Sequence, residues 1–540
     1  MFIKKKVLKN KDGTTRTYLQ LVESRRINGK PRQIVLMTLG RMDTEEGRER
    51  IHKITSTLLK NGDEFKLLNP EKDIKANSTK ELGPLLIFQR LWKELGFEEI
   101  VREEMEKSGA EFEVASAIFQ MVLNRLTQPC SKVQLEFWNE DIYDLNKFEL
   151  HQYYRAMDYL IEHKDSVEQG IFYRMRDIFS QTVDVVLFDT TSLVYYGEGD
   201  KGEKLLRHGF SKAKRGDLKQ VIVGVLMSKE GIPLGHETYE GNKNDVSCFK
   251  EVIKKVKDKF QLGRVIMVGD RGMTNNPNLE LLKESGLDYI LGFRMRTIPK
   301  KERSEVLSKT NLRKLINSNL QFKEVDHNGI RLIVCYNEER AVKDKEHRER
   351  QLEILNEKLK SGKVKTLISN PFYKKFVSIK SKKPELDREK IKQDELYDGV
   401  FVLTTSTRLS CLQVVESYKD LWQVEMAFRQ LKSELEVGPI FHWRDRRIRA
   451  HIMICFLALV MRTCFYKLLQ SKQKDVSYRK VLWDLKSLRA VELKIQNEPI
   501  ILRTELKSGA ALAFRVMNMR APNRILSQSG NFSGVVVRQK

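Results

Sequence analysis

The spacing of apolar and polar residues changes along the chain, and each change predicts a different kind of structure. Residues 1–45 alternate in strand fashion around the turn signals KDG and NGK, which predicts a small β unit. From 46 to 180 apolar residues recur at helical spacing, as in LLIFQRLWKELGF, so a helical segment is expected. Residues 299–396 are rich in charge. The stretch 397–475 holds the strand VFVLTT and then long helices, before a mixed tail over 476–540.

The most regular pattern lies between residues 181 and 298. A strand ending at Asp189 is followed by a basic loop, the strands QVIVGVLMS and IPLGHETYEG, a helix, and a fourth strand, RVIMVGD, ending at Asp270. This is the order of a ribonuclease H-like fold, in which a crossover helix returns the fourth strand to lie parallel beside the first. The expected fold is therefore α/β, with a ribonuclease H-like core, an inserted α+β segment at 299–396 and a mostly helical N-terminal region.

Two aspartates are expected to meet at one edge of this sheet. If Asp189 and Asp270 end parallel neighbouring strands, both carboxylates stand at the rim where open α/β sheets place their ligands. Two acids held so close raise each other's pKa unless a cation lies between them. Carboxylate oxygens suit Mg²⁺, for which Mn²⁺ can substitute. The sequence therefore predicts a divalent-metal site, and a site for two ions needs a third carboxylate.

The stretch YKDLWQVEMAFRQLKSELEVGPIFHW, residues 418–443, offers that third carboxylate. Tyr418, Glu425 and Lys432 recur every seven residues, close to two helical turns, and so share one helix face. A separate apolar stripe can pack the helix on the sheet, and its members are Leu421, Val424, Phe428, Leu431 and Leu435. Glu425 is the candidate ligand, with Glu434 as the next choice.

Together these motifs resemble a DDE transposase of a bacterial or archaeal insertion sequence, from the group with a long insertion between the second Asp and the Glu. That group shows a helical Y-x2-R-x3-E-x6-K signature, which Tyr418, Glu425 and Lys432 match, while Leu421 stands in place of the Arg. FDTTS, GDRGM, a GN pair and RIRAH are similar too. The resemblance covers residues 180–475.

The resemblance implies a transposase that binds the terminal inverted repeats of its element, nicks the ends and joins the freed 3′ hydroxyl to target DNA. It implies that Asp189, Asp270 and Glu425 are catalytic and hold two Mg²⁺ ions, which activate the attacking oxygen and stabilise the leaving one. The implied partner is double-stranded DNA, both transposon ends and target, bound by a homodimer or higher oligomer. The implied location is the prokaryotic cytoplasm, in association with the nucleoid.

The charge balance agrees with a DNA partner. Lys and Arg number 98 against 73 Asp and Glu, a formal net charge of +25, and such an excess is typical of proteins that bind a polyanion. Basic residues at 205–217 and 443–449 adjoin the proposed site and are expected to contact phosphates. The individual DNA contacts predicted are Tyr418, Lys432, Arg271, Lys212, Arg215 and Arg429. The N-terminal β unit and the helical segment are the candidates for end recognition, without a clear helix-turn-helix pattern.

Alternative interpretations stay open at this point. An Asp after a hydrophobic strand also occurs in haloacid dehalogenase-like phosphatases, but those need a second acid two residues later, where this chain has Thr191. A transposase-derived DNA-binding protein with a dead site is another alternative, although all three acids are present. Asp189 alone could be a turn or N-cap residue. Glu425 and Lys432 could be solvated helix charges.

Several function classes are disfavoured. Six cysteines without a CxxC pair argue against a zinc ribbon or a disulfide framework and favour a reducing compartment. The N-terminus lacks the apolar core of a signal peptide. The longest apolar run, at 452–461, is about half of what a membrane span needs, so a buried helix and no membrane partner are expected. Four histidines without metal-ligand spacing are expected to be structural, namely His208, His236, His442 and His451.

Overall fold

The structure of the protein, a computed structural model, describes most of the chain. The described ranges are 1–27, 30–60, 74–106, 111–178, 185–197, 202–210, 212, 215–260, 265–314, 320–360, 371–380, 383–495 and 498–526. The chain divides into two compact units. The first comprises Met1–Ser78 and Glu492–Ile500, and the second Thr79–Val491 and Ile501–Lys540.

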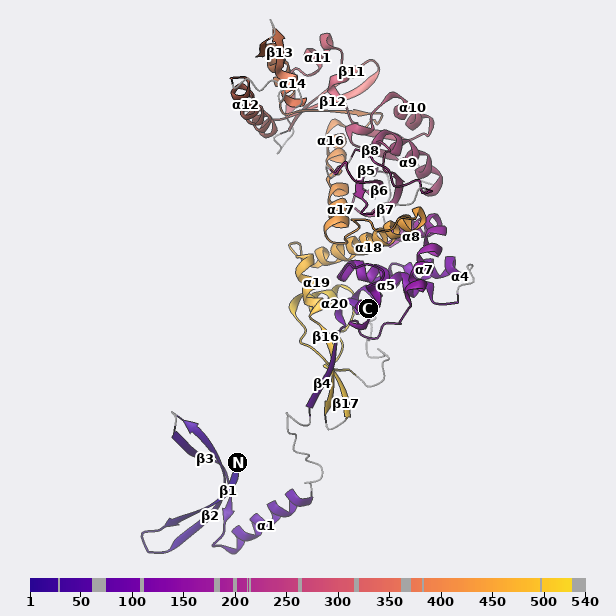
Figure 1. The fold of residues 1–540 in the computed structure, drawn as a ribbon. Helices are drawn as coiled ribbons and strands as arrows, with labels where there is room; N and C mark the ends of the chain where they lie inside the picture. The colour runs from indigo at the N-terminus through magenta and orange to yellow at the C-terminus, as the bar shows by residue number, and fades with distance from the viewer. Residues whose placement is uncertain are drawn as a thin grey trace. The chain divides into compact units, whose positions relative to one another are not determined.

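The first unit is built on an antiparallel sheet of order β1-β2-β3 (Figure 1). Its strands are β1 (Phe2–Lys9), β2 (Thr15–Ile27) and β3 (Lys30–Arg41). Helix α1 (Glu45–Lys60) packs on β3 at Gly40, where an added Cβ would lie 3.0 Å from the Ile51 side chain. A larger residue at this position would push the helix off the strand, so the glycine sets how closely α1 approaches.

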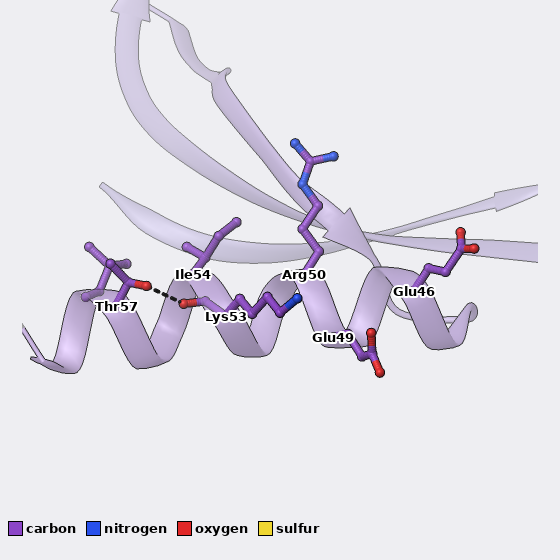
Figure 2. Close-up of a pocket in the computed structure, with 7 residues that line it drawn as sticks. Glu46, Glu49, Arg50, Lys53, Ile54 and Thr57 are labelled. Carbon is purple, nitrogen blue, oxygen red and sulfur yellow. Dashed lines mark hydrogen bonds between the residues drawn. The ribbon is translucent and has the colours of Figure 1, made fainter.

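A groove of about 520 Å³ runs along α1. Figure 2 shows Arg50 and Ile54 on the side of the helix toward the strands, and Glu49 pointing away from them. The lining residues are Glu46, Glu49, Arg50, Lys53, Ile54, Thr57 and Leu58. Its two acids and two bases offset one another, so the groove has no excess charge that would mark it as a site for an ionic ligand.

The second unit is organised around a mixed sheet of nine strands, in the order β10-β11-β12-β15-β9-β8-β5-β6-β7. Their bounds are β5 Val185–Val194, β6 Gln220–Ser228, β7 Pro233–Glu240, β8 Ile266–Gly269, β9 Asp288–Gly292, β10 Arg313–Lys314, β11 Leu320–His327, β12 Ile330–Asn337 and β15 Val400–Thr405. β6 is antiparallel to β5 and β7, whereas β8 is parallel to β5 and β9. The strand directions expected for residues 181–298 are therefore present.

The strand β5 continues past Asp189, so the expectation that this residue ends a strand is wrong. Antiparallel pairing with β6 holds β5 in extended form to its end, whereas the parallel pairing with β8 stops at Phe188 opposite Gly269. Beyond that pair the β8 side of β5 has no strand beside it. Asp189 and Asp270 follow directly on the last parallel pair and are therefore neighbours, although only Asp270 comes after a strand end.

Helices cover both faces of the sheet (Figure 1). One face carries α9 (Asp245–Phe260) and α10 (Asn276–Glu284), and the other α17 (Trp422–Ser433) and α18 (Asp445–Lys472). Successive residues of β5 point to opposite faces. Accordingly Phe188 packs in the core beneath α9 and α10, whereas Leu187 belongs to the core that contains α17 and α18.

The 28-residue helix α18 lies at the centre of the larger core. By length and composition it could cross a membrane, but 78% of its most apolar window is buried inside the protein. It is therefore the buried helix expected at 452–461. Helices of both chain halves surround it. Further helices of the second unit are α3 Gly83–Glu94, α4 Phe97–Glu106, α5 Val114–Thr127, α6 Leu135–Glu140, α7 Leu150–Glu162, α8 Lys164–Ile178, α19 Tyr478–Lys486 and α20 Ser508–Val516. A separate four-stranded sheet, of order β18-β17-β16-β4, consists of β4 Ile74–Glu81, β16 Arg489–Ile495, β17 Glu498–Arg503 and β18 Ile525–Leu526.

The segment expected as an insertion, 299–396, extends the central sheet. β12 pairs with β15, which pairs in turn with β9, so the sheet runs on without a break into β11 and β10. The other elements of this segment are α11 Lys300–Val306, α12 Glu338–Lys360, α14 Pro371–Phe376, β13 Val377–Lys380, β14 Lys383–Leu386 and α15 Arg388–Glu395. The expected strand GIRLIVCYN is β12, and the expected charged helix is α12.

Candidate active site

Three acids singled out in the sequence line one cleft of about 780 Å³. Asp189 comes from β5, Asp270 follows β8, and Glu425 stands on α17. Tyr418, from helix α16 (Cys411–Lys419), and Arg271 line the same cleft. The middle of β5, the end of β8 and the neighbouring helices thus bring side chains that are far apart in sequence to one hollow.

Asp189 lies in a mostly buried position, where a charged carboxylate is disfavoured. The pKa of Asp189 is raised to about 6, mainly because the side chain is buried. The Lys212 ammonium and the Thr190 amide oppose this increase, whereas the carboxylates of Asp270 and Asp245 add to it. Its Oδ1 accepts a hydrogen bond from the Thr190 amide at 2.7 Å. A cation near these acids would relieve their mutual repulsion.

Asp270 takes the capping role that was considered for Asp189. Its Oδ1 accepts from the Arg271 amide at 2.7 Å, at the start of the short 3₁₀ helix Arg271–Met273. Tyr418 lies beside Asp270, and burial, together with the negative charge of this acid, raises the pKa of Tyr418. The tyrosine predicted to contact DNA is therefore also a neighbour of a carboxylate of the cleft.

The helix expected over residues 418–432 is interrupted. α16 ends before, and α17 begins after, the pair Asp420 and Leu421, although both residues keep right-handed helical dihedral angles. Tyr418 and Glu425 still reach the same cleft. The apolar stripe behaves as expected, with Val424, Phe428, Leu431 and Leu435 buried and Leu421 partly buried. Glu425 itself is exposed.

The polar run after Asp189 is buried but bonded to charged groups. Thr190 Oγ1 donates to Asp245 Oδ1 at 2.5 Å, and Thr191 Oγ1 accepts from Lys432 Nζ at 2.7 Å. Lys212 Nζ donates to the Thr190 carbonyl at 2.6 Å. Burial and the nearby Lys212 charge lower the pKa of Lys432. Buried hydroxyls need such partners, and here they anchor two ammonium groups beside the acids.

The other predicted DNA contacts have different surroundings. Arg215 pairs with Asp217 through two hydrogen bonds, of 2.9 and 2.7 Å. Arg271 is exposed at the cleft, and Arg429 is exposed on α17. Lys212 does not extend into solvent but turns toward Asp189.

Three arginines of the basic run 443–449 bind groups of the protein. Arg446 and Arg447 pair with Asp158 of α7, and Arg449 donates to the Thr238 carbonyl of β7 at 2.8 Å. These contacts hold the N-terminal end of α18 in the core because α7 and β7 offer acceptors there. That this run contacts phosphates stays a prediction.

Three of the four singled-out histidines are buried or packed, in agreement with a structural role. His236 Nδ1 lies 2.6 Å from Glu168 Oε1, and burial lowers the pKa of the ring. Burial also lowers the pKa of His442 to about 4 and that of His451 well below its ordinary value. His208 is exposed.

Sequence reasoning missed several groups near the acids. Asp245 was not among the predicted site residues, yet it starts α9 and accepts a hydrogen bond from Thr190. Arg340 and Lys343, from the first turns of α12, also line the cleft, as does the exposed Trp422. Only the pairing of β12 with the central sheet brings α12 there, and no local sequence pattern encodes that pairing.

The donor set of the cleft fits a divalent cation, since carboxylate oxygens from three elements face one hollow and two of them repel each other. Within the described ranges, no three His, Cys, Asp or Glu side chains lie close enough together to hold one ion among them. The three acids therefore line one cleft, but in the described part of the chain their carboxylates do not surround a single ion position.

Comparisons with known proteins identify the class. Residues 181–461 match the family described as transposase DDE domain, and residues 3–70 match the N-terminal domain of IS1634 family transposases. The first match covers more than half of the chain, so the chain belongs to the transposase DDE domain family. With the N-terminal match, it is a DDE transposase of an insertion sequence, an enzyme of DNA cleavage and transfer. This family generally uses divalent metal ions.

Solved structures add little to this assignment. The chain is similar to the piggyBac transposase synaptic complex with hairpin DNA at 12% identity and a TM-score of 0.38, over 76% of this chain and 82% of that one. For the Mos1 transposase paired-end complex with the left transposon end, the identity is 12% and the TM-score 0.15, over 39% and 60%. No curated protein matches the chain.

Proposed function

We propose that Asp189, Asp270 and Glu425 are the catalytic acids of this transposase and hold two Mg²⁺ ions, for which Mn²⁺ can substitute. One observation carries the proposal. The register of β5 and β8 makes Asp189 and Asp270 neighbours just beyond the last parallel pair, and Glu425 faces the same cleft. The strand order β9-β8-β5-β6-β7 supports a ribonuclease H-like core.

The chain's own groups would bind and orient the DNA. Bound divalent ions would supply Lewis acidity that activates the attacking water or 3′ hydroxyl and stabilises the leaving oxygen. Lys432, bonded to Thr191 beside the acids, would bind a phosphate as a point charge, and Arg340 and Lys343, which line the cleft, would do so as well. The Tyr418 hydroxyl, beside Asp270, would help to position this carboxylate. This scheme uses no covalent protein nucleophile.

The substrate we propose is the terminal inverted repeat of the element, with target DNA as acceptor. The match of residues 3–70 to an insertion-sequence N-terminal domain supports a role of this region in end recognition. Its strand β1, FIKKKVLK, is exposed along its whole length and carries four lysines. We propose a homodimer or higher oligomer on DNA, acting in the prokaryotic cytoplasm.

The test is cleavage of a labelled end duplex by purified full-length variants with Mg²⁺. Asp189→Ala, Asp270→Ala and Glu425→Gln should each cut at less than about a hundredth of the wild-type rate, because metal-assisted chemistry carries several kcal/mol of the barrier. Binding to the same duplex should stay near wild type. Glu280→Gln, an exposed acid on α10, is the matched control and should cut normally.

Cleavage by any of the three variants above that level would remove the residue from the catalytic set. For Glu425, the third carboxylate would then have to be another acid, such as Glu434. A wild-type protein that binds end duplex but never cuts would instead favour a DNA-binding protein without catalysis.

A further inference from the structure

The ammonium group of Lys212 lies inside the acidic cluster of the cleft. Its Nζ is 3.9 Å from Asp189 Oδ1 and 3.9 Å from Asp245 Oδ1. It also donates to the Thr190 carbonyl at 2.6 Å and lies 3.2 Å from the hydroxyl of the same residue. A positive charge thus stands between two carboxylates, and the Asp245 carboxylate is one of the groups that raise the pKa of Asp189.

The position of Lys212 is built by the backbone around it. Its own amide donates to Ser192 Oγ at 3.0 Å, which fixes the residue alongside β5. β8 has ended at this level, so the side chain can reach the Thr190 carbonyl across the open edge of the strand. Thr190 Oγ1 in turn donates to Asp245. These bonds fix the acids and the lysine relative to one another.

We infer that the Lys212 ammonium is the internal counter-ion of the metal-free site. It competes with the divalent cation for electrostatic attraction to the carboxylates of Asp189 and Asp245. This inference rests on the proposed function, in which Asp189 is a metal ligand. It makes Lys212 a positioning residue, distinct from the simple phosphate contact predicted from the sequence. About a third of its side chain, 37%, is exposed, so the ammonium can move aside when the cation binds.

The electrostatics set the direction of the effect. A neutral residue at 212 leaves the carboxylates with their full negative field, so a divalent cation should bind more tightly. Once the ammonium has moved aside to roughly 6–8 Å from the divalent cation, removing its unit charge under near-water screening corresponds to roughly a five- to tenfold change in affinity. A residue that only supported the fold of the loop would have the opposite effect, because its loss would disorder the acids and weaken the binding of the cation.

The experiment measures Mn²⁺ binding to the full-length protein without DNA, by calorimetry and by the electron paramagnetic resonance of free Mn²⁺. Lys212→Met should bind Mn²⁺ about five- to tenfold more tightly than wild type. Lys212→Gln, which keeps a donor for the Thr190 carbonyl, is a second neutral variant in case the first folds poorly, and should act alike. Lys212→Arg keeps the charge and should stay near wild type. Lys250→Met, an exposed lysine on α9, is the matched control.

The variant Asp189→Asn distinguishes the proposed metal role of Asp189 from the counter-ion role of Lys212. If it leaves Mn²⁺ binding unchanged, the proposed metal role of Asp189 is wrong. If it weakens binding while both neutral Lys212 variants match wild type or bind more weakly, the counter-ion inference alone is overturned. The same holds if Lys212→Arg binds as tightly as Lys212→Met, because charge would then not be the cause.

Discussion

A carboxylate in the middle of a buried strand costs free energy unless charged or hydrogen-bonding groups surround it. Asp189 meets this condition through the Thr190 amide and the Lys212 ammonium. The threonines that follow would be costly buried hydroxyls, but they bind Asp245 and Lys432. At the scale of single residues, the polar run in an otherwise apolar strand therefore positions charges around one acid.

The role of Lys432 can be tested at this scale. We expect Lys432→Met to weaken binding of an end duplex and to flatten its salt dependence by about one phosphate contact, because the ammonium acts as a point charge. Thr191→Val should give part of this loss, since it removes the acceptor that holds Nζ at 2.7 Å. Binding titrations at several salt concentrations measure both. Lys472→Met, exposed at the end of α18, is the control, and an unchanged slope for Lys432→Met would contradict the role.

At the scale of elements, the sequence predicted what periodicity and strand order encode. The parallel pair of β5 and β8 follows from the crossover helix α9, and this pair places Asp189 beside Asp270. The break between α16 and α17 was not predicted. Asp420 and Leu421 keep helical dihedral angles and interrupt only the helical hydrogen bonding, so the spacing of apolar residues shows no break there. The partners of Lys212 were not predicted either. Residues of a basic loop show no periodic spacing, so the sequence does not indicate where the loop runs.

The close contact between β9 and α16 gives a second prediction. A Cβ added at Gly292 would lie 2.7 Å from the Tyr418 hydroxyl and 2.8 Å from the Arg271 amide. Gly292→Ala should therefore displace Tyr418, a neighbour of Asp270 in the cleft, lower cleavage about tenfold or more, and destabilise the fold by about 1–3 kcal/mol. Cleavage rates and thermal melting measure the two effects. Gly216→Ala, which adds its methyl to open space, should change neither; a fully active Gly292→Ala enzyme would exclude a need for this close approach.

A third prediction concerns the buried ion pairs that join α8, β7 and α9. Glu237, at 6% exposure, accepts from Lys164 at 3.3 Å and from Lys255 at 2.8 Å. Burial alone would raise the pKa of Glu237, but the two lysines lower it below the ordinary value of 4.5. Its contribution to stability is therefore present above about pH 4.5 and is lost as the pH falls through the lowered pKa.

Glu237→Gln should accordingly cost about 2 kcal/mol near pH 7, because it leaves a buried lysine with one charged partner fewer. The difference from wild type should shrink as the pH falls below about 4.5, where the wild-type carboxyl becomes protonated too. Denaturant unfolding at pH 7, 5 and 3.5 measures it. Glu251→Gln removes a more exposed carboxylate of α9, which pairs with Lys243 just before that helix, and should cost much less. Equal losses for the two variants would contradict the role of burial.

At the scale of the whole molecule, the sequence did not predict which segments of the chain pack into the same hydrophobic core or join the same sheet. The segment 299–396 was expected as an insertion, but β12 and β11 continue the central sheet beyond β15. Helices from both halves of the chain pack on α18. Such pairings join residues far apart in the chain and produce no repeating pattern in the local sequence. The apolar run that forms α18, in contrast, is evident within a short stretch of sequence. The excess of basic residues is visible in the sequence, but which of them remain available to DNA depends on their ion pairs.

That distinction can be measured through the salt dependence of DNA binding. The net charge of +25 would suggest a large number of phosphate contacts, yet Arg215, Arg446 and Arg447 already pair with acids of the protein. Each phosphate neutralised contributes about 0.9 to the slope of log K against log salt. We therefore expect a steep fall in affinity for an end duplex between 50 and 300 mM salt. Arg446→Gln should leave the slope unchanged, because Asp158 and Glu162 hold its side chain. Arg340→Gln should lower the slope by about one contact, because Arg340 lines the cleft and its contact with Asp344 is longer, at 3.8 Å. Fluorescence anisotropy across that salt range gives both slopes. Binding that ignores salt would refute the electrostatic basis of DNA binding, and a lower slope for Arg446→Gln would show that its pairs with Asp158 and Glu162 open on DNA.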